Sequence, residues 1–289
     1  MAIRSLPKER YPEIVKELES RFALGQEANH DPEEVMSFIV HEMGGLYGGV
    51  TSVACREMFF FRVRPRSHFS DPTDLFEKSQ HSYPPAEFCT SHGRCNIPGH
   101  PVFYCSDSHD CAIAEMKSPE EEDYVLSFWR LPARTIYTAK FLCATNLSTG
   151  RLLEHKTKIL QDSFEQSGMS DELNCGRLKA FMEAWSDLFL SEEYCLSSAI
   201  AYRLLYGAFR GGQDMIGYGS AFDNGYMNFA LPTRLADELE LVRIFNVKTR
   251  LDKQTTWVSY WEPNSEKIWN NVTPDSIPYL DARVKYGIL

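Results

Sequence analysis

The sequence lacks long hydrophobic runs, and it lacks a surplus of positive charge. No stretch of the 289 residues approaches the roughly 18 consecutive apolar residues that a membrane-spanning helix needs. The opening residues, MAIRSLPKERYPEIVKELE, contain no apolar core of a signal peptide. The formal net charge of -10 argues against nucleic acid as the main partner, because phosphate backbones are bound by clustered lysine and arginine. The sequence therefore predicts a cytoplasmic protein that binds neither a membrane nor nucleic acid.

The chain also lacks CxxC pairs, although it has eight cysteines. Four cysteines and three histidines gather in residues 89–111, CTSHGRCNIPGHPVFYCSDSHDC. A structural zinc site takes two ligand pairs at regular short spacings. Only Cys89, His92 and Cys95 are regularly spaced here, and the remaining four follow at mixed gaps. The spacing therefore predicts no metal site; most of the cysteines are expected to be buried thiols, and a zinc-dependent interaction module is only the weakest alternative.

The N-terminal part has the periodicity of helices. One apolar stripe runs along PKERYPEIVKELESRFAL: Tyr11, Ile14, Val15, Leu18 and Phe22. A second pattern, DPEEVMSFIVHEMGGL, starts at Asp31 and Pro32, a typical helix start. We expect two helices within residues 7–46, which either cover one side of the main domain or meet a partner.

Beyond these helices the patterns change to strands and turns. EMFFFRVRP predicts a strand that carries Arg62 and Arg64 on the same side. HPVFYC predicts a second strand, entered through a turn at Pro98 and Gly99, and Ser108 is expected to cap the following helix DCAIAEM. Further strands are predicted in VLSFWRL, TIYTAKFLCATNL and ELELVRIFNVKTRL.

The second half combines helices with a hairpin. A helical region is expected between 150 and 195, and the helix EEYCLSSAIAYRLLYGAFR is expected to end at Gly211 and Gly212. MIGYGSAFDNGYMNFALP predicts two strands joined at Asn224 and Gly225, a strong hairpin signal.

No internal repeat or low-complexity linker interrupts these patterns, so they predict an α+β fold built on a mostly antiparallel sheet, with added helices at the N-terminus and in a central insertion. Residues 1–54 are expected to form an N-terminal helical segment, and residues 55–289 a catalytic domain with a helical insertion at about 147–190. The oligomeric state is left open.

A polar skeleton remains in residues 93–116 once the cysteines and histidines are set aside. It reads G-R-x-N-x-x-G, then a tyrosine at the end of a strand, then A-x-x-E on the next helix. Arg94, Tyr104 and Glu115 lie ten and eleven positions apart. A strand followed by a capped helix can bring the three side chains to one cleft, because the turn returns the chain beside the strand end.

In this stretch the sequence resembles the RES domain family, named for its Arg, Glu and Ser. The resemblance matches an early arginine to Arg62, a late Y-x-S element to Ser220 and a hairpin asparagine to Asn228. It covers roughly residues 59–116 and 194–231, and the N-terminal helices lie outside it. Cys95 replaces the usual aromatic residue of the family, a mild departure at the pocket wall.

The resemblance implies an ADP-ribosyltransferase-like fold and an enzyme that consumes NAD as its substrate by cleaving the nicotinamide–ribose bond. It further implies a toxin paired with a helix-turn-helix antitoxin. The acceptor is left open among water, phosphate and a protein, so glycohydrolase, phosphorylase and ADP-ribosyltransferase all remain. A non-catalytic binding protein that keeps the fold is the further alternative.

The implied site has a catalytic set and a ligand-binding set. Glu115 would stabilise the positive charge that develops on the ribose, while Arg94 and Arg62 would bind the pyrophosphate. Tyr104 would stack on nicotinamide or bind a ribose hydroxyl, and Ser220 would fix the amide or the ribose. The catalytic set is Arg94, Tyr104, Glu115 and Ser220; the NAD-binding set is Arg62, Asn96, Gly99 and Asn228, with Asn96 and Gly99 shaping the loop.

Overall fold

A computed structural model gives the fold of residues 10–22, 31–42, 52–55, 58–116, 122–133, 137–142, 183–191, 194–207, 213–220, 226–249, 255–261 and 268–270. The helices are α1 (Arg10–Phe22), α2 (Pro32–Glu42), α3 (Lys78–His81), α4 (His109–Ala114), α7 (Tyr194–Leu205) and α8 (Thr233–Ala236), with short 3₁₀ turns at Arg66–His68, Pro72–Phe76 and Ala86–Phe88. The strands are β1 (Ser52–Cys55), β2 (Met58–Pro65), β3 (Val102–Ser106), β4 (Glu122–Leu131), β5 (Tyr137–Leu142), β6 (Met215–Gly219), β7 (Met227–Pro232), β8 (Glu240–Thr249), β9 (Thr255–Trp261) and β10 (Ile268–Asn270).

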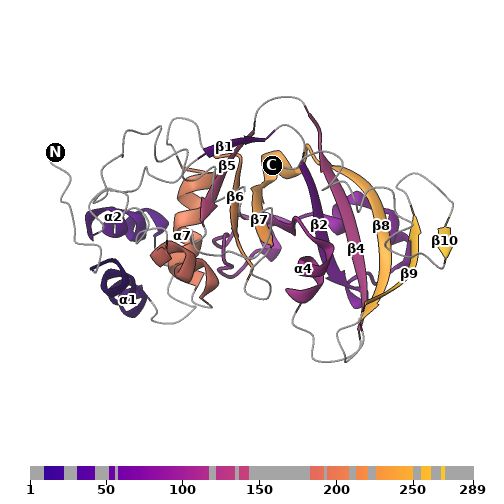
Figure 1. The fold of residues 1–289 in the computed structure, drawn as a ribbon, viewed down its shortest axis with the longest axis horizontal. Helices are drawn as coiled ribbons and strands as arrows, with labels where there is room; N and C mark the ends of the chain where they lie inside the picture. The colour runs from indigo at the N-terminus through magenta and orange to yellow at the C-terminus, as the bar shows by residue number, and fades with distance from the viewer. Residues whose placement is uncertain are drawn as a thin grey trace.

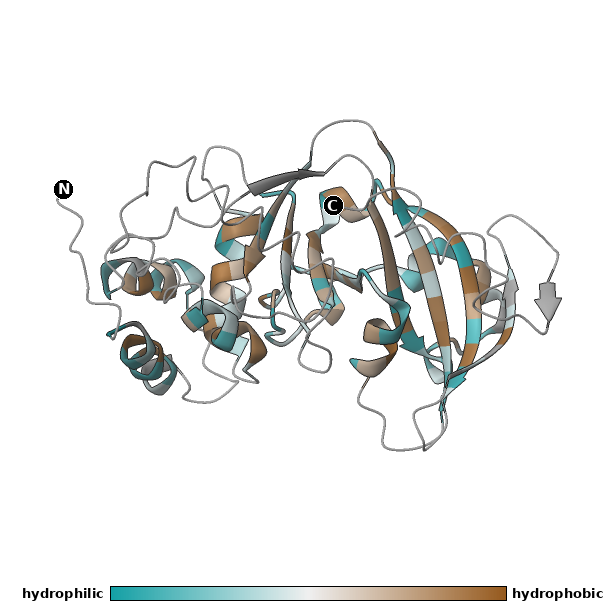
Figure 2. Cartoon of the chain, viewed as in Figure 1, coloured by the Kyte–Doolittle hydropathy of each residue, from teal (hydrophilic) through white to brown (hydrophobic). Residues whose placement is uncertain are grey.

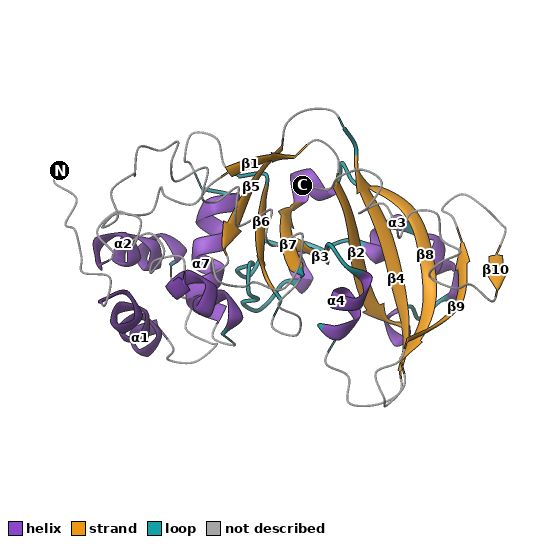
Figure 3. Cartoon of the chain, viewed as in Figure 1, coloured by secondary structure: helices purple, strands orange, loops and turns teal. Residues whose placement is uncertain are grey.

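The described strands form one sheet in the order β1-β5-β6-β7-β3-β2-β4-β8-β9-β10. Within it, β5 and β6 are parallel, and the other pairs are antiparallel. This confirms the prediction of a mixed α+β fold with a mostly antiparallel sheet, and Figure 3 shows the helices α1, α2 and α7 gathered at one end of it. None of the helices in the described part of the chain is long and apolar enough to cross a membrane.

The sheet has a weak seam between β2 and β3. These two strands pair at a single position, Phe61 with Ser106, whereas β2 pairs with β4 along its whole length, from Met58 to Pro65. The seam divides the sheet into two half-sheets, β1-β5-β6-β7-β3 and β2-β4-β8-β9-β10. Helix α4 lies at this division, between β7 and β2 in Figure 1.

The N-terminal helices pack against α7. Asp31 caps α2 as predicted, because its side chain accepts a hydrogen bond of 2.9 Å from the Glu33 N–H. The apolar stripe of α1 and that of α2 are buried in the same core as the inner side of α7, and Figure 2 shows that each helix carries both hydrophobic and hydrophilic segments. An ion pair between Arg203 on α7 and Glu33 joins the two helices at the surface. Helices α1 and α2 therefore cover α7 at one end of the sheet domain (Figure 3). Strand β1 starts at Ser52, so the sheet begins before residue 55.

One predicted boundary is wrong: α7 ends at Leu205 and not at Gly211 and Gly212. Its last carbonyl groups find partners from elsewhere in the chain and in the turn that follows, where the Gly207 N–H donates to the Arg203 carbonyl at 3.2 Å. The Leu204 carbonyl accepts a hydrogen bond of 3.0 Å from the Gln213 N–H, and the Leu205 carbonyl accepts one of 2.9 Å from Arg234. Gly211 and Gly212 lie outside the described residues, as does the predicted turn at Asn224 and Gly225. The greater part of the expected insertion at 147–190 also lies outside them, and its residues 183–190 are helical.

Candidate active site

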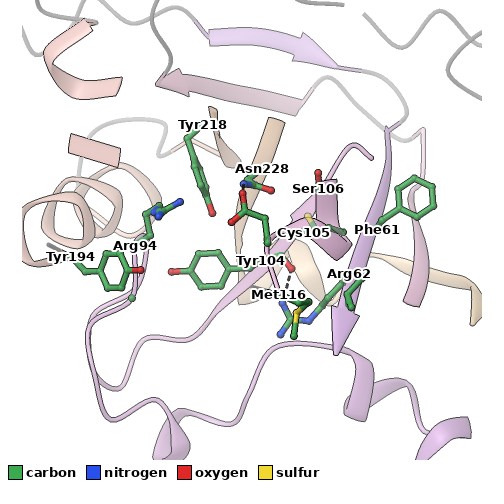
Figure 4. A pocket seen from close by; sticks show the side chains of 14 residues that line it. Phe61, Arg62, Arg94, Tyr104, Cys105, Ser106, Met116, Tyr194, Tyr218 and Asn228 are labelled. Atoms are coloured by element: carbon green, nitrogen blue, oxygen red, sulfur yellow. Dashed lines mark hydrogen bonds between the residues drawn. The ribbon is translucent and has the colours of Figure 1, made fainter. Parts of the chain in front are cut away.

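A cleft of about 480 Å³ lies at the seam between the half-sheets, within the size range of small-molecule sites. Its walls come from β2, the loop before β3, β3 itself, α4, the first residue of α7, β6 and β7. Five residues predicted from the sequence line it directly: Arg62, Arg94, Tyr104, Glu115 and Asn228. Figure 4 shows the side chains of Arg62, Arg94, Tyr104 and Asn228 around the cleft, each from a separate element.

Glu115 is carried into the cleft by α4. Ser108 caps the helix as predicted, because its hydroxyl accepts a hydrogen bond of 3.5 Å from the Cys111 N–H. Ala112, on the inner side of α4, packs in the same buried cluster as Phe61 of β2. Glu115 follows the last helical residue, at the point where the helix ends over the sheet.

The Glu115 carboxylate is held through one oxygen. Its Oε1 accepts 2.7 Å hydrogen bonds from Ser220 Oγ and from Asn228 Nδ2. No donor to the other oxygen, Oε2, is found among the described residues. Two donors on one oxygen fix the carboxylate's orientation, while Oε2 stays available to a ligand in the cleft.

Ser220 and Asn228 are buried supports of this carboxylate. Their exposed fractions are 3% and 6%. The Asn228 amide is also fixed on its other side, because its Oδ1 lies 3.7 Å from the Cys111 thiol, which donates to it. Burial raises the pKa of Cys111 to about 11, so the thiol keeps the proton that it donates. Ser220 was expected to touch the substrate, but its hydroxyl proton is directed to Glu115.

The Tyr104 hydroxyl is occupied within the loop that precedes β3. It donates to Asn96 Oδ1 at 2.9 Å and accepts from the Cys95 N–H at 2.7 Å. Burial raises the pKa of Tyr104 well above its usual value, so the phenol stays neutral. The residue therefore offers its ring to the cleft, which favours stacking over a hydrogen bond to ribose.

Asn96 and Gly99 do not line the cleft. Asn96 connects the loop internally: its Nδ2 donates to the Ser91 carbonyl at 3.1 Å and its Oδ1 accepts from Tyr104. Gly99 is exposed and has a positive φ of 76°, a conformation that glycine adopts readily. A close approach is found instead at Gly93, where a Cβ atom would lie 2.2 Å from Asn96 Oδ1.

Arg62 connects the two half-sheets. Its Nη1 donates a 2.6 Å hydrogen bond to the Tyr104 carbonyl on β3, across the seam. Burial, together with repulsion from Arg64, lowers the pKa of Arg62 to about 9, so the guanidinium is charged at neutral pH. Its Nε is buried without a hydrogen-bond partner in the described part of the chain. Arg64 shares the strand face as predicted but donates to the Ser82 carbonyl, away from the cleft.

Arg94 lies between two aromatic rings. Its guanidinium carbon is 5.7 Å from the ring centroid of Tyr194, on α7, and 5.7 Å from that of Tyr218, on β6. Such distances are typical of cation–π contacts. Its Nε is buried, and the described residues provide it with no acceptor. The cleft thus contains two guanidinium groups opposite one carboxylate.

A family model described as RES domain matches residues 59–254. The chain belongs to the RES domain family. The match includes both arginines, Tyr104, Glu115 and Ser220, and the family is one of enzymes related to NAD. No curated protein and no solved structure matches the chain, so the likeness of this RES domain to ADP-ribosyltransferases stays a prediction.

Three aromatic residues that line the cleft of the RES domain were not selected from the sequence: Phe61, Tyr194 and Tyr218. Tyr218 is the tyrosine of the Y-x-S element and pairs across the strands with Asn228, so the motif and the alternation of strand faces could have indicated it. Tyr194 is one of 14 tyrosines and begins a helix far from the motif in sequence, and no local signal marks it. Among the described residues no three histidine, cysteine or acidic side chains are grouped to hold a metal ion. Cys89, Cys95, Cys105 and Cys111 are buried free thiols, as expected for most of the cysteines.

Proposed function

We propose that this RES domain consumes NAD by cleaving the bond between nicotinamide and ribose. The observation that carries the proposal is the Glu115 carboxylate, fixed through Oε1 by Ser220 and Asn228, with Oε2 available in the cleft. Cleavage of this bond creates positive charge on the ribose in an oxocarbenium-like transition state. A preorganised carboxylate stabilises that charge more than it stabilises the ground state.

Cleavage of the nicotinamide–ribose bond requires no strong acid. The glycosidic electron pair moves to the ring nitrogen, whose positive charge disappears as neutral nicotinamide leaves. An acceptor oxygen then forms a new bond to the same ribose carbon, and its proton, where it has one, is lost to the medium. The role assigned to Glu115 is electrostatic, because the leaving group is already activated by its charge.

The remaining cleft residues fit the other parts of NAD. Its pyrophosphate carries two negative charges, and arginine binds such oxygens in pairs. Arg62 and Arg94 are the cationic side chains in the cleft wall, and each has a buried Nε without a partner in the described structure. The ring of Tyr104 is suited to stack on a planar heterocycle such as nicotinamide.

The test is incubation of the purified full chain with NAD, followed by chromatography of the products. We expect free nicotinamide to be released. Free ADP-ribose would identify water as the acceptor, ADP-ribose 1-phosphate would identify phosphate, and label transferred from NAD to protein would identify an ADP-ribosyltransferase. Absence of nicotinamide release, with NAD still bound, would refute cleavage and support a non-catalytic binding protein.

We also propose that the protein acts as a toxin by depleting NAD. Expression should then slow growth and lower cellular NAD together, and a helix-turn-helix antitoxin is the expected partner. Growth arrest without a fall in NAD would contradict this role.

A further inference from the structure

The loop that carries Arg94 is seated on one face of α7. His92 Nδ1 lies 2.9 Å from Ser198 Oγ. Arg94 contacts the ring of Tyr194 at 5.7 Å, and the ring of His100 lies 4.9 Å from that of Tyr202. Residues before Arg94, Arg94 itself and residues after it therefore all contact α7.

The partners on α7 are spaced by four residues: Tyr194, Ser198 and Tyr202, followed by Tyr206. This spacing places their side chains on one side of a helix. Tyr206 completes the series, because its ring lies 5.6 Å from that of His100 and its hydroxyl donates to the Pro101 carbonyl at 2.9 Å. The whole length of α7 therefore contacts the segment between the start of the loop and β3.

The hydrogen bond between His92 and Ser198 has a defined direction. The single hydroxyl proton of Ser198 is donated to the Cys195 carbonyl at 3.0 Å. The Ser198 oxygen is therefore the acceptor toward His92, and the proton of that bond is on Nδ1 of the imidazole. Ser198 is fully buried and His92 is half-buried, so the bond reaches from the protein interior to the loop.

We propose that this face of α7 holds the loop of residues 89–100 in the position that directs Arg94 into the cleft. Tyr194, Ser198 and His92 are then positioning residues: Tyr194 orients the guanidinium, and the pair of His92 with Ser198 fixes the backbone two residues before it. Two of the three histidines in residues 89–111, His92 and His100, therefore serve to dock the loop. The consequence for the reaction rests on the proposed function, because it requires that Arg94 bind the pyrophosphate.

Two neighbouring serines provide a matched test of the loop contact. Ser197 and Ser198 are both fully buried on α7, and the hydroxyl of each donates to the backbone carbonyl three residues earlier. Of the two, it is Ser198 that also forms a hydrogen bond with His92. Ser198→Ala should raise the KM for NAD about 3- to 10-fold, the scale of one lost hydrogen bond, with little change in kcat. Ser197→Ala should leave the KM within about twofold of the parent. Equal KM values in the two variants would overturn the proposal.

The ring of Tyr194 is tested by a conservative pair. Tyr194→Leu removes the aromatic face and should raise the KM by about 3- to 30-fold, whereas Tyr194→Phe keeps the face and should recover the greater part of that loss. A KM in Tyr194→Phe as high as that in Tyr194→Leu would show that the hydroxyl matters and would refute the positioning role of the ring.

A second measurement does not depend on NAD turnover. Amide hydrogen exchange of residues 89–100 should accelerate in Ser198→Ala and stay unchanged in Ser197→Ala, in the absence of any ligand. Unchanged exchange in both variants would overturn the docking proposal even if the enzyme consumes NAD. Accelerated exchange in Ser198→Ala, in a protein that does not consume NAD, would instead support docking and refute the proposed function.

Discussion

Replacing Glu115 with glutamine separates the charge of this residue from its shape. The carbonyl oxygen of glutamine can accept the same two hydrogen bonds from Ser220 and Asn228. The change therefore keeps the two hydrogen bonds and removes the negative charge that the carboxylate presents to the cleft. What is lost is the attraction between this charge and the developing charge on the ribose.

The size of that loss can be estimated in two ways. Two unit charges about 4 Å apart attract by about 4 kcal/mol at an effective dielectric constant of about 20. Removal of one preorganised group that stabilises a transition state costs about 2.7–4 kcal/mol, or about 10²- to 10³-fold in kcat. Both values predict that Glu115→Gln lowers kcat by at least about 10²-fold.

The fold should survive this change. Each of the two hydrogen bonds to Oε1 weakens by about 1 kcal/mol when the acceptor becomes neutral, against a total stability of about 5–15 kcal/mol. Glu115→Ala should cost more, because Ser220 and Asn228 are then left buried without this acceptor. Thermal unfolding should rank the parent, Glu115→Gln and Glu115→Ala in that order.

The assay is the initial rate of nicotinamide release at saturating NAD. Glu87→Gln is the matched control, because Glu87 is an exposed glutamate just before the loop and does not line the cleft. The control should retain the parent rate. If folded Glu115→Gln releases nicotinamide as fast as the parent, the electrostatic role of Glu115 is wrong.

Three further changes test the supports of the site and of the fold. Ser220→Ala removes one of the two donors to the catalytic carboxylate and should lower kcat about 10-fold, from the value of about 1.5 kcal/mol for a hydrogen bond to a charged group; an unchanged kcat would show that the second donor suffices. Gly93→Ala would bring a Cβ atom to 2.2 Å from Asn96 Oδ1, so we expect a lower Tm and a higher KM for NAD, and wild-type values of both would contradict the close approach. Burial lowers the pKa of Lys140 to about 8 from 10.5, so the charged amine destabilises the folded state below about pH 8, and stability recovers as pH rises from there to about 10.5. Lys140→Met should therefore raise stability by up to about 3 kcal/mol at pH 7 and by much less at pH 10.5, measured by denaturant unfolding; an equal gain at both pH values would refute the linkage.

Local sequence patterns predicted the elements that carry the site. The strand with Arg62, the strand ending beyond Tyr104 and the Ser108-capped helix all occur where the patterns indicated. These features depend on side-chain alternation and capping, which act over a few residues. The expected neighbourhood of Arg94, Tyr104 and Glu115 is likewise found in the cleft.

Contacts between distant segments could not be predicted in the same way. The pairing of Tyr194 with Arg94 joins residues 100 positions apart and has no local signature. The end of α7 was misjudged partly for the same reason, because Gln213 and Arg234 satisfy its last carbonyls through tertiary contacts, but Gly207 in the turn that follows was a local signal. Asn96 illustrates a third limit: its residue type suits a ligand contact, but its side chain bonds within the loop.

The single pairing between β2 and β3 has a mechanical consequence. Each half-sheet is stiffened by continuous strand ladders, whereas the junction is held by the pair of Phe61 and Ser106, by the bond from Arg62 to Tyr104 and by packing such as that of Phe60 on Phe229. The junction therefore has fewer backbone hydrogen bonds to resist bending than either half-sheet, and bending there would change the width of the cleft. A ligand that touches Arg62 on one half-sheet and Arg94 beside the other would add a connection across the junction and would oppose that bending.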